Sequence, residues 1–263
     1  MKHSWVLVAL LGFTTAQAQD SAQAVIDCMR ANIPDSVRVQ KLSFATSNSI
    51  GDTRSIQARL FAVRERAEDG KRLLRSMLRL DAPAHLAGAA YLIRETTEDY
   101  LRDGMFVYLP SVRRVRRVTG TFADGALMGT DFSYYDFRQL HSAFGDLSAI
   151  LERPLEVDGR RAHGLLFKPL PEAETRYTAV RAWVDQQTCV PLRVNFHEGD
   201  TIRKQLTSPK TTLRQTGNRW YAAEMEMRDL LNDSRTTLRI LEVSSDEGIS
   251  DRYFQPGTFY TAH

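Results

Sequence analysis

An apolar side chain at every second residue, repeated over consecutive segments joined by turn residues, most limits how this chain can fold. In residues 56–62 and again in residues 74–80, one face of an extended strand would be almost wholly apolar. Gly-Asp at 51–52 and Asp-Gly at 69–70 stand where hairpin turns are needed. Such alternation over successive hairpins predicts an antiparallel meander.

The alternation returns in the second half of the chain, again with glycine-containing turns at 158–159, 199–200 and 217–218. The whole chain would contain about ten or eleven strands at roughly even spacing. Those expected in the second half lie at residues 155–157, 165–167, 177–185, 190–197, 201–206, 211–215, 220–227 and 236–243.

Only two segments have the spacing of an amphipathic helix. Residues 21–33 would form one, with Ser21 as its N-cap and Pro34 at its end. Residues 136–151 would form the other, with Asp136 at its N-terminus; its apolar face would comprise Phe137, Leu140, Phe144, Leu147 and Leu151.

These elements predict a mainly β protein of the α+β kind, built as one large antiparallel sheet with two helices. No low-complexity linker or shift in composition divides the chain, so one domain is the simplest organisation. Two helices cover too little of so large a sheet. Either the sheet closes and side chains fill its interior, or it stays half-open around an apolar cavity. The pattern is compatible with both.

The N-terminus has the three-part layout of a secretory signal peptide. A basic start is followed by an apolar run and then by Ala-x-Ala at 16–18, which predicts cleavage after Ala18. The apolar run has about nine residues, whereas a membrane-spanning helix needs ~20. We therefore expect residues 1–18 to be removed and residues 19–263 to form a single exported domain.

The two cysteines, Cys28 and Cys189, would enter an oxidising compartment. An even count in such a compartment favours a disulfide, which would pin the first helix to a strand of the second half. The alternative is two separate buried thiols that pack as small apolar residues.

Charge and motifs argue against several classes of function. Thirty-five basic and 32 acidic residues leave a net charge of only +3, so a dedicated nucleic-acid binder is not expected. The six histidines are scattered, and the His197-Glu198 pair has no second histidine at metal-ligand spacing. No nucleophile elbow, zinc, P-loop or dinucleotide-binding motif is found. We expect no catalytic residues, no metal and no cofactor, although a triad assembled in space needs no motif.

Residues 103–137 contain two linked boxes, a YLP-x-x-RRVRR run at 108–117 and an MGTDFSYxD box at 128–136. They resemble one branch of the LolA-like family of outer-membrane lipoprotein-sorting proteins. The similarity extends back to residues 28–34 and 83–92 and forward to residues 183–185 and 190–192. It covers nearly all of the chain after the signal peptide.

The resemblance implies a strongly curved antiparallel sheet, an unclosed barrel, capped by helices that act as a lid over an apolar cavity. It also implies a periplasmic carrier that binds acyl chains of lipoproteins or other lipids and moves them between membranes. An inner-membrane exporter and an outer-membrane acceptor are the implied partners, and we expect a monomer. The alternative is a non-catalytic adaptor of an exporter, which binds protein instead of lipid.

Large apolar and aromatic side chains in and beside the two boxes are the candidates for the cavity and its lid. They have two interpretations, core packing beneath the second helix or contact with acyl chains beside a lid hinged at Gly125 and Gly129. The candidates are Met105, Val107, Leu127, Met128, Phe132, Tyr134 and Tyr135.

The arginines of the first box form a local basic patch made of Arg113, Arg114, Arg116 and Arg117. They would either keep a strand edge solvated or attract anionic headgroups or an acidic partner surface. Valines at 112, 115 and 118 do not fit one face of a regular strand, so a bulge or a tight turn must lie between them.

Overall fold

The computed structural model describes residues 21–66, 70, 72–95, 104–144, 147–170, 175–245 and 248–261. The expected signal peptide and Asp69 of one expected turn lie outside these residues.

One antiparallel sheet of 13 strands dominates the described part of the chain. Its order is β6-β5-β4-β3-β2-β1-β15-β14-β11-β10-β9-β8-β7. The bounds are β1 Arg38–Ser47, β2 Thr53–Arg66, β3 Arg72–Ala82, β4 Ala90–Arg94, β5 Gly104–Leu109, β6 Arg114–Arg117, β7 Ser148–Val157, β8 Arg160–Lys168, β9 Ala179–Asp185, β10 Pro191–Glu198, β11 Thr201–Thr207, β14 Glu224–Asp229 and β15 Ser234–Ser245.

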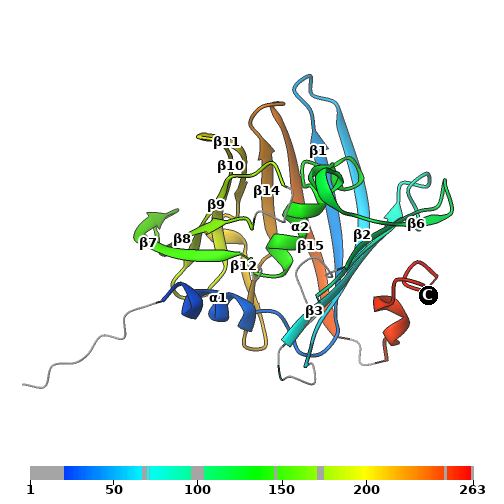
Figure 1. The fold of residues 1–263 in the computed structure, drawn as a ribbon, viewed down its shortest axis with the longest axis horizontal. Coiled ribbons are helices and arrows are strands. Elements are labelled where there is room, and N and C mark those ends of the chain that lie inside the picture. The colour runs from blue at the N-terminus through cyan, green and yellow to red at the C-terminus, as the bar shows by residue number, and fades with distance from the viewer. Residues whose placement is uncertain are drawn as a thin grey trace, which may run out of the picture.

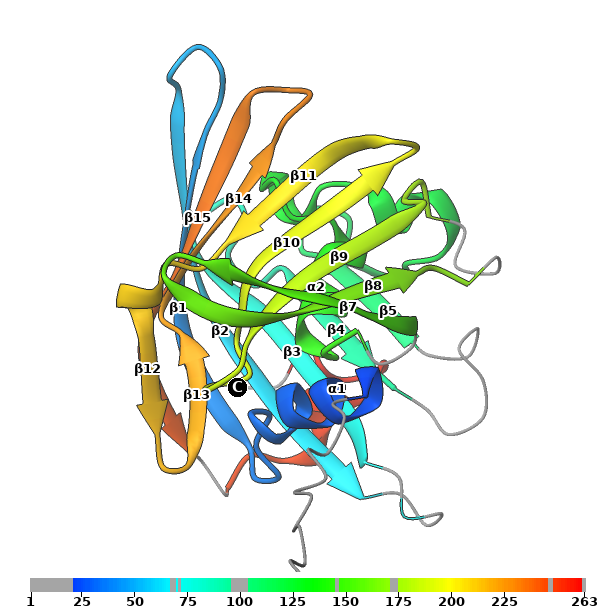
Figure 2. The ribbon, with the colours of Figure 1, turned by 90° about the vertical axis from the view of Figure 1, so that its left-hand side faces the viewer.

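The sheet consists of two meanders joined along one seam. Strands β1 to β6 follow one another outward in sequence order, and the strands of the second half return inward to β15, which pairs with β1. The outermost strands, β6 and β7, do not pair with each other, so the sheet is strongly curved but unclosed (Figures 1 and 2). This confirms the expected mainly β, half-barrel architecture.

The inward face of the sheet follows the predicted alternation. In the β2–β3 pair, Ala58 lies opposite Leu80 and Leu60 opposite Leu78, and all four side chains are buried in the main core. Because side chains of period two fall on one face, the alternation fixes which residues line the inside of the curve.

A second, smaller hairpin projects between β11 and β14. It consists of β12 (Leu213–Thr216) and β13 (Arg219–Ala222), which form a separate two-stranded sheet (Figure 2). The strand expected over 220–227 is therefore two strands, which separate at Ala223. Short 3₁₀ helices occupy Gly120–Asp124, Leu127–Gly129, Lys210–Thr212 and Asp251–Phe254.

The first helix, α1, runs over Ala22–Ala31 and begins as expected, with the amide of Ala24 donating to the Ser21 hydroxyl at 3.0 Å. It lies near the start of β7 and is joined to the second half by the Cys28–Cys189 disulfide, whose Cα atoms are 5.8 Å apart. The expected disulfide is thus present.

The second helix was predicted too long and with the wrong cap. It is α2, Tyr134–His141, and it lies inside the curve of the sheet (Figures 1 and 2). Ser133 is the N-cap, and Asp136 is the third helical residue of a capping box. Ala143 and Phe144 have positive φ and end the helical course, so Leu151 belongs to β7.

The arginine-rich box forms a tight turn instead of a bulge. Residues 110–113 turn back after β5, with Arg113 at a φ of 49°, and β6 then pairs with β5. The turn places Val112 outside the strands, which explains the irregular valine spacing.

Candidate functional site

An apolar cavity of about 170 Å³ lies between the inward face of the sheet, the two helices and the β12–β13 hairpin. We define the floor of the cavity as a set of buried leucines from five strands. These are Leu42 of β1, Leu60 of β2, Leu74 of β3, Leu206 of β11 and Leu238 of β15.

The cavity mouth consists of half-buried residues from three parts of the chain. Ile33 follows α1, Arg38 begins β1, and Trp220 and Tyr221 belong to β13. Because these residues are half-buried while the floor is fully buried, the cavity communicates with solvent on the side of α1 and the hairpin.

Residues 120–141, which we call the cover segment, form another wall of the cavity. Phe132 and Phe137, both buried, contribute its apolar lining. Behind them the hydroxyl of Tyr91 in β4 donates to the carbonyl of Tyr134 at 3.0 Å, and the Tyr91 ring lies edge-on to Tyr134 and Phe137. Burial raises the pKa of Tyr91, which therefore stays a neutral donor.

Asn32, just after α1, joins the parts that surround the mouth. Its amide donates to the carbonyl of Thr188 at 2.9 Å, and its side-chain oxygen accepts from the amide of Trp220 at 2.8 Å. Together with the adjacent Cys28–Cys189 disulfide, these contacts hold α1, the β9–β10 turn and the hairpin together.

Several polar side chains interrupt the apolar lining, namely Asn32, Arg38, Gln40, His141 and Ser208. His141 stacks on Phe137 and its Nδ1 is 2.8 Å from the Phe137 carbonyl. Desolvation, together with the nearby charge of Arg38, lowers the pKa of His141 to about 4. The imidazole is therefore neutral at pH 7, and Arg38 carries the charge at this end of the cavity.

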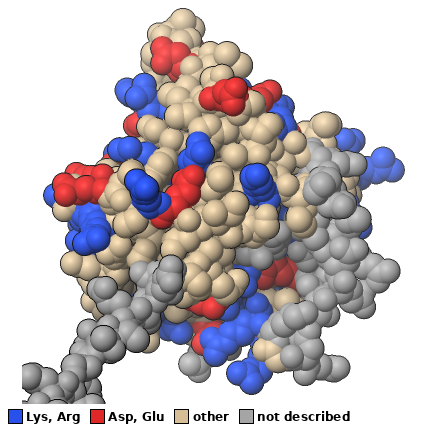
Figure 3. All heavy atoms as spheres, turned by 60° about the vertical axis from the view of Figure 1, so that its left-hand side comes forward, with Lys and Arg blue, Asp and Glu red and all other residues tan. Residues whose placement is uncertain are grey.

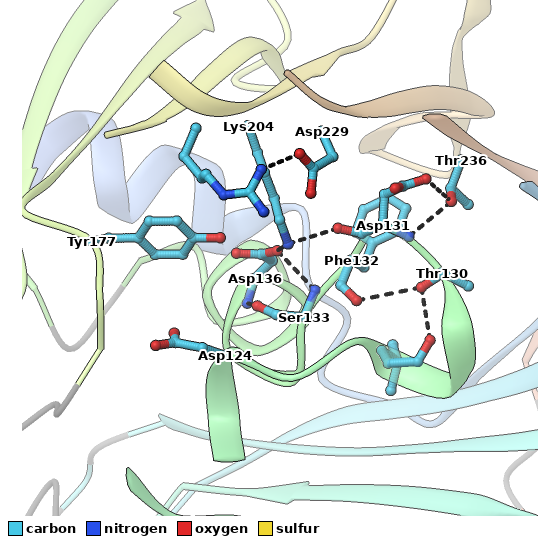
Figure 4. A network of polar contacts seen from close by, with 12 residues as sticks. Asp124, Thr130, Asp131, Phe132, Ser133, Asp136, Tyr177, Lys204, Asp229 and Thr236 are labelled. Atoms are coloured by element: carbon cyan, nitrogen blue, oxygen red, sulfur yellow. Dashed lines mark hydrogen bonds and ion pairs between the residues drawn. The ribbon is translucent and has the colours of Figure 1, made fainter. Parts of the chain in front are cut away.

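A buried polar network fixes the cover segment to the second half of the sheet (Figure 4). Lys204 of β11 donates to the Asp131 carbonyl at 2.8 Å and to the carboxylate of Asp136 at 2.9 Å. The Asp131 carboxylate accepts from Thr236 at 2.6 Å and also from Ser234, both of β15.

Tyr177 and Asp124 extend this network toward the loop before β9. The Tyr177 hydroxyl points at Asp136 (Figure 4), and burial, followed by the charge of that carboxylate, raises the pKa of Tyr177 well above its usual value. Asp124 accepts from Thr175 at 2.7 Å and from the amide of Arg176 at 2.9 Å. The second sequence box is therefore where the cover segment attaches to the sheet.

Of the seven side chains proposed from sequence for the cavity and lid, Phe132 lines the cavity. Val107, Leu127, Tyr134 and Tyr135 are buried in the main core, and Met105 and Met128 are half-buried against it. These six are not among the described residues that line the cavity. Gly129 has a φ of +80°, and Met128 before it a φ of 52°, so the box does contain an unusual backbone turn.

The four arginines of the first box lie together at an outer edge of the sheet. Arg113 is in the turn and the other three are on β6, and all four side chains are exposed. On the face shown in Figure 3, acidic and basic side chains are interspersed, as a net charge of +3 suggests. The described residues contain no cluster of three metal-ligating side chains and no helix long and apolar enough to span a membrane.

A family model described as "uncharacterized protein" matches residues 73–260, which is most of the chain. A solved DUF1329 family protein from Desulfovibrio piger aligns over 90% of this chain and 98% of its own, with a TM-score of 0.79 and 24% identity. The chain belongs to the family that this model describes, and its fold is LolA-like.

Two further solved structures share this LolA-like fold. An outer membrane lipoprotein-sorting protein domain from Vibrio parahaemolyticus has a TM-score of 0.78 at 19% identity, with 91% of this chain and 98% of that domain covered. A LolA superfamily protein from Nitrosomonas europaea has a TM-score of 0.69 at 15% identity, with 90% and 98% covered. No curated protein matches the sequence.

Three polar residues of the site, Arg38, His141 and Lys204, were not predicted from the sequence. A signal for Lys204 was available, because it stands two residues before Leu206 in an alternating strand and so shares its face. A cation at an inward position of a strand requires a buried partner, and that requirement points to an acidic residue elsewhere.

Proposed function

We propose that this chain is a non-catalytic periplasmic carrier that binds the acyl chain of a lipid or lipoprotein and moves it between membranes. The observation that carries the proposal is the cavity itself, which has a leucine floor and a mouth open to solvent. The LolA-like fold, and the lipoprotein-sorting description of the Vibrio parahaemolyticus neighbour, support the same function.

Burial of hydrocarbon would supply the binding free energy. Each CH₂ removed from water contributes about 0.8 kcal/mol, so a sixteen-carbon chain has a gross gain of roughly 10 kcal/mol before ordering costs. The cavity of about 170 Å³ is close in size to an engineered apolar cavity of ~150 Å³ that accepts benzene. A whole acyl chain therefore requires the cover segment or the hairpin to move outward.

The remaining parts of the proposal concern place and partners. Export with cleavage after Ala18 would bring the chain to the periplasm, where the Cys28–Cys189 disulfide is stable. There the monomer would receive its guest from an inner-membrane exporter and deliver it to an outer-membrane acceptor. The exposed arginines at 113–117 suit contact with anionic headgroups or an acidic partner.

Native mass spectrometry of protein purified from its own periplasm, together with titration of a fluorescent fatty acid, tests the carrier function. We expect co-purified lipid and saturable binding. Ala62→Phe, which would fill the cavity, should abolish binding, whereas Ala87→Phe in the exposed β3–β4 loop should not. Thermal unfolding verifies that both variants fold. Lipid-free protein that ignores the fatty acid would contradict the proposal.

The exposed arginine edge favours a second candidate, an exporter adaptor that binds protein. Reversing the charge of Arg113, Arg114, Arg116 and Arg117 would then abolish capture of the partner and leave fatty-acid binding unchanged. If the same variant keeps its partner, the arginine edge serves only to keep β6 solvated.

A further inference from the structure

Arg38 lies at the mouth of the apolar cavity, where it could contact the polar end of a bound ligand. It begins β1 on the inward face that continues with Gln40, Leu42 and Phe44, and its side chain lines the mouth of the cavity. His141 of α2 and Tyr221 of β13 are close enough to interact with it electrostatically. The guanidinium thus lies where the apolar floor ends and solvent begins.

No acidic partner accompanies this guanidinium among the described residues, and its Nε atom is buried without a hydrogen bond. Two other partly buried arginines do have acidic partners, Arg160 with Asp185 at 2.7 Å and Arg203 with Asp229. An unpaired charge in such a position costs free energy unless something compensates it.

The nearest charged neighbour makes the local potential more positive. Arg219 of β13 acts on Arg38 as a like charge, and its own carboxylate, Asp35, is 3.7 Å away on the protein surface. Desolvation and this like charge lower the pKa of Arg38 to about 10, so it remains charged at pH 7. The mouth therefore presents an uncompensated positive charge beside an apolar cavity.

We infer that the guest is a single acyl chain ending in an anionic headgroup, which Arg38 binds at the mouth while the hydrocarbon lies on the leucine floor. The inference rests on the proposed carrier function and specifies its ligand. A carboxylate and a phosphate both match the fork of a guanidinium, and either would satisfy the buried Nε. Because the cavity of about 170 Å³ must widen even for one acyl chain, we expect a single chain at a time.

The test compares sixteen-carbon ligands that differ only in the headgroup: palmitate, hexadecyl phosphate and the neutral hexadecanol. The wild-type protein should bind at least one of the two anions about tenfold or more tightly than hexadecanol. Arg38→Met should lose that preference and retain its hexadecanol affinity. Arg239→Met, which removes an exposed arginine paired with Glu224 on the same sheet, should change neither.

Stability provides an independent measurement. Because Arg38 is unpaired in the ligand-free protein, Arg38→Met should unfold at the same temperature as the wild type or higher. Arg38→Lys should retain part of the preference for anions. Whichever anion binds more tightly identifies the headgroup as carboxylate or phosphate, and both results support the inference.

Three results would overturn the inference. If the wild type binds anionic and neutral ligands equally tightly, there is no headgroup site. The same conclusion follows if Arg38→Met loses affinity for all three ligands to the same extent. Both results leave the carrier function intact. If the wild type binds none of the three ligands, the carrier function fails and the inference fails with it.

Discussion

Lys204 and Arg38 both occupy inward positions of strands, but only Lys204 is neutralised by the protein itself. Its ammonium contacts the fully buried Asp136, which is also the third helical residue of the capping box of α2. A buried pair of this kind adds little net stability compared with an apolar pair, but breaking it is expensive. Its effect is therefore to specify where the cover segment sits.

Lys204→Met should destabilise the protein by about 3–5 kcal/mol, because Asp136 would keep a buried charge without its partner. Urea denaturation measures the change. Hydrogen exchange should show the largest loss of protection in the cover segment, since Lys204 also holds the Asp131 carbonyl.

The matched control is Lys41→Met, which removes a lysine paired with Glu242 at 2.6 Å while both side chains are more than half exposed. Its cost should be below about 1 kcal/mol. Similar costs for the two variants would show that Lys204 does not anchor the cover segment.

His141 should make the stability of the protein depend on pH. Its pKa is about 4 in the folded protein and about 6.5 in an unfolded chain, so between these values the unfolded state binds more protons. The contribution of neutral His141 to the free energy of unfolding has its full value above pH 6.5 and decreases as the pH falls toward 4. We expect the melting temperature to fall by a few degrees between pH 7.5 and 4.5.

The comparison variant for this effect is His141→Gln, which should show a smaller decrease over the same interval. His197, whose pKa is also lowered by burial, remains in both proteins and so cancels. Asp185 and Asp229, whose pKa values lie below their usual 3.8, titrate below this interval. Identical pH profiles for wild type and variant would show that His141 titrates normally.

At the level of elements, the strands and the presence of the second helix were predictable, but the end of that helix was not. Burial of one face of a strand imposes alternation, so alternation between glycine turns locates the strands. The helical spacing continues beyond His141 only by coincidence, since Leu147 and Leu151 lie beyond a chain reversal at Ala143 and Phe144. The positive φ angles of Ala143 and Phe144 cannot be predicted from a local sequence pattern, because neither residue is a glycine.

The site was harder to predict than the fold for a similar reason. Tyr134 and Tyr135 belong to a box that identifies the family, yet they are buried in the core. Arg38 belongs to no box, and it reaches the mouth only because β13 and α2 approach the start of β1. Contacts between residues so far apart in sequence cannot be seen in a local pattern.

Loss of the disulfide should act on α1 and therefore on the cavity mouth. Closing a separation of 161 residues is worth about 5 kcal/mol in the chain-entropy model. Cys28→Ser with Cys189→Ser should lower the free energy of unfolding by several kcal/mol. Urea denaturation with and without reductant measures this: reductant should weaken the wild type and leave the double variant unchanged.

At the scale of the whole molecule, the unpaired edges β6 and β7 decide whether the interior is filled. A closed barrel of this size would enclose its own side chains, whereas the open curve leaves the leucine floor facing a cavity between α1, α2 and the hairpin. Composition and alternation are the same in both cases. The cavity therefore depends on how the two meanders are joined at β1 and β15, which only the three-dimensional structure shows.

An open interior makes global stability depend on the guest, because a ligand that binds only the folded state shifts the unfolding equilibrium. A fatty acid at one hundred times its dissociation constant should stabilise the protein by about 2.7 kcal/mol. For a chain of this size that corresponds to a rise in melting temperature of roughly 5–10 °C. Ala62→Phe should melt at a temperature that the ligand does not change, because the added ring occupies the cavity. A ligand-induced rise that persists in this variant would place the bound chain elsewhere on the sheet.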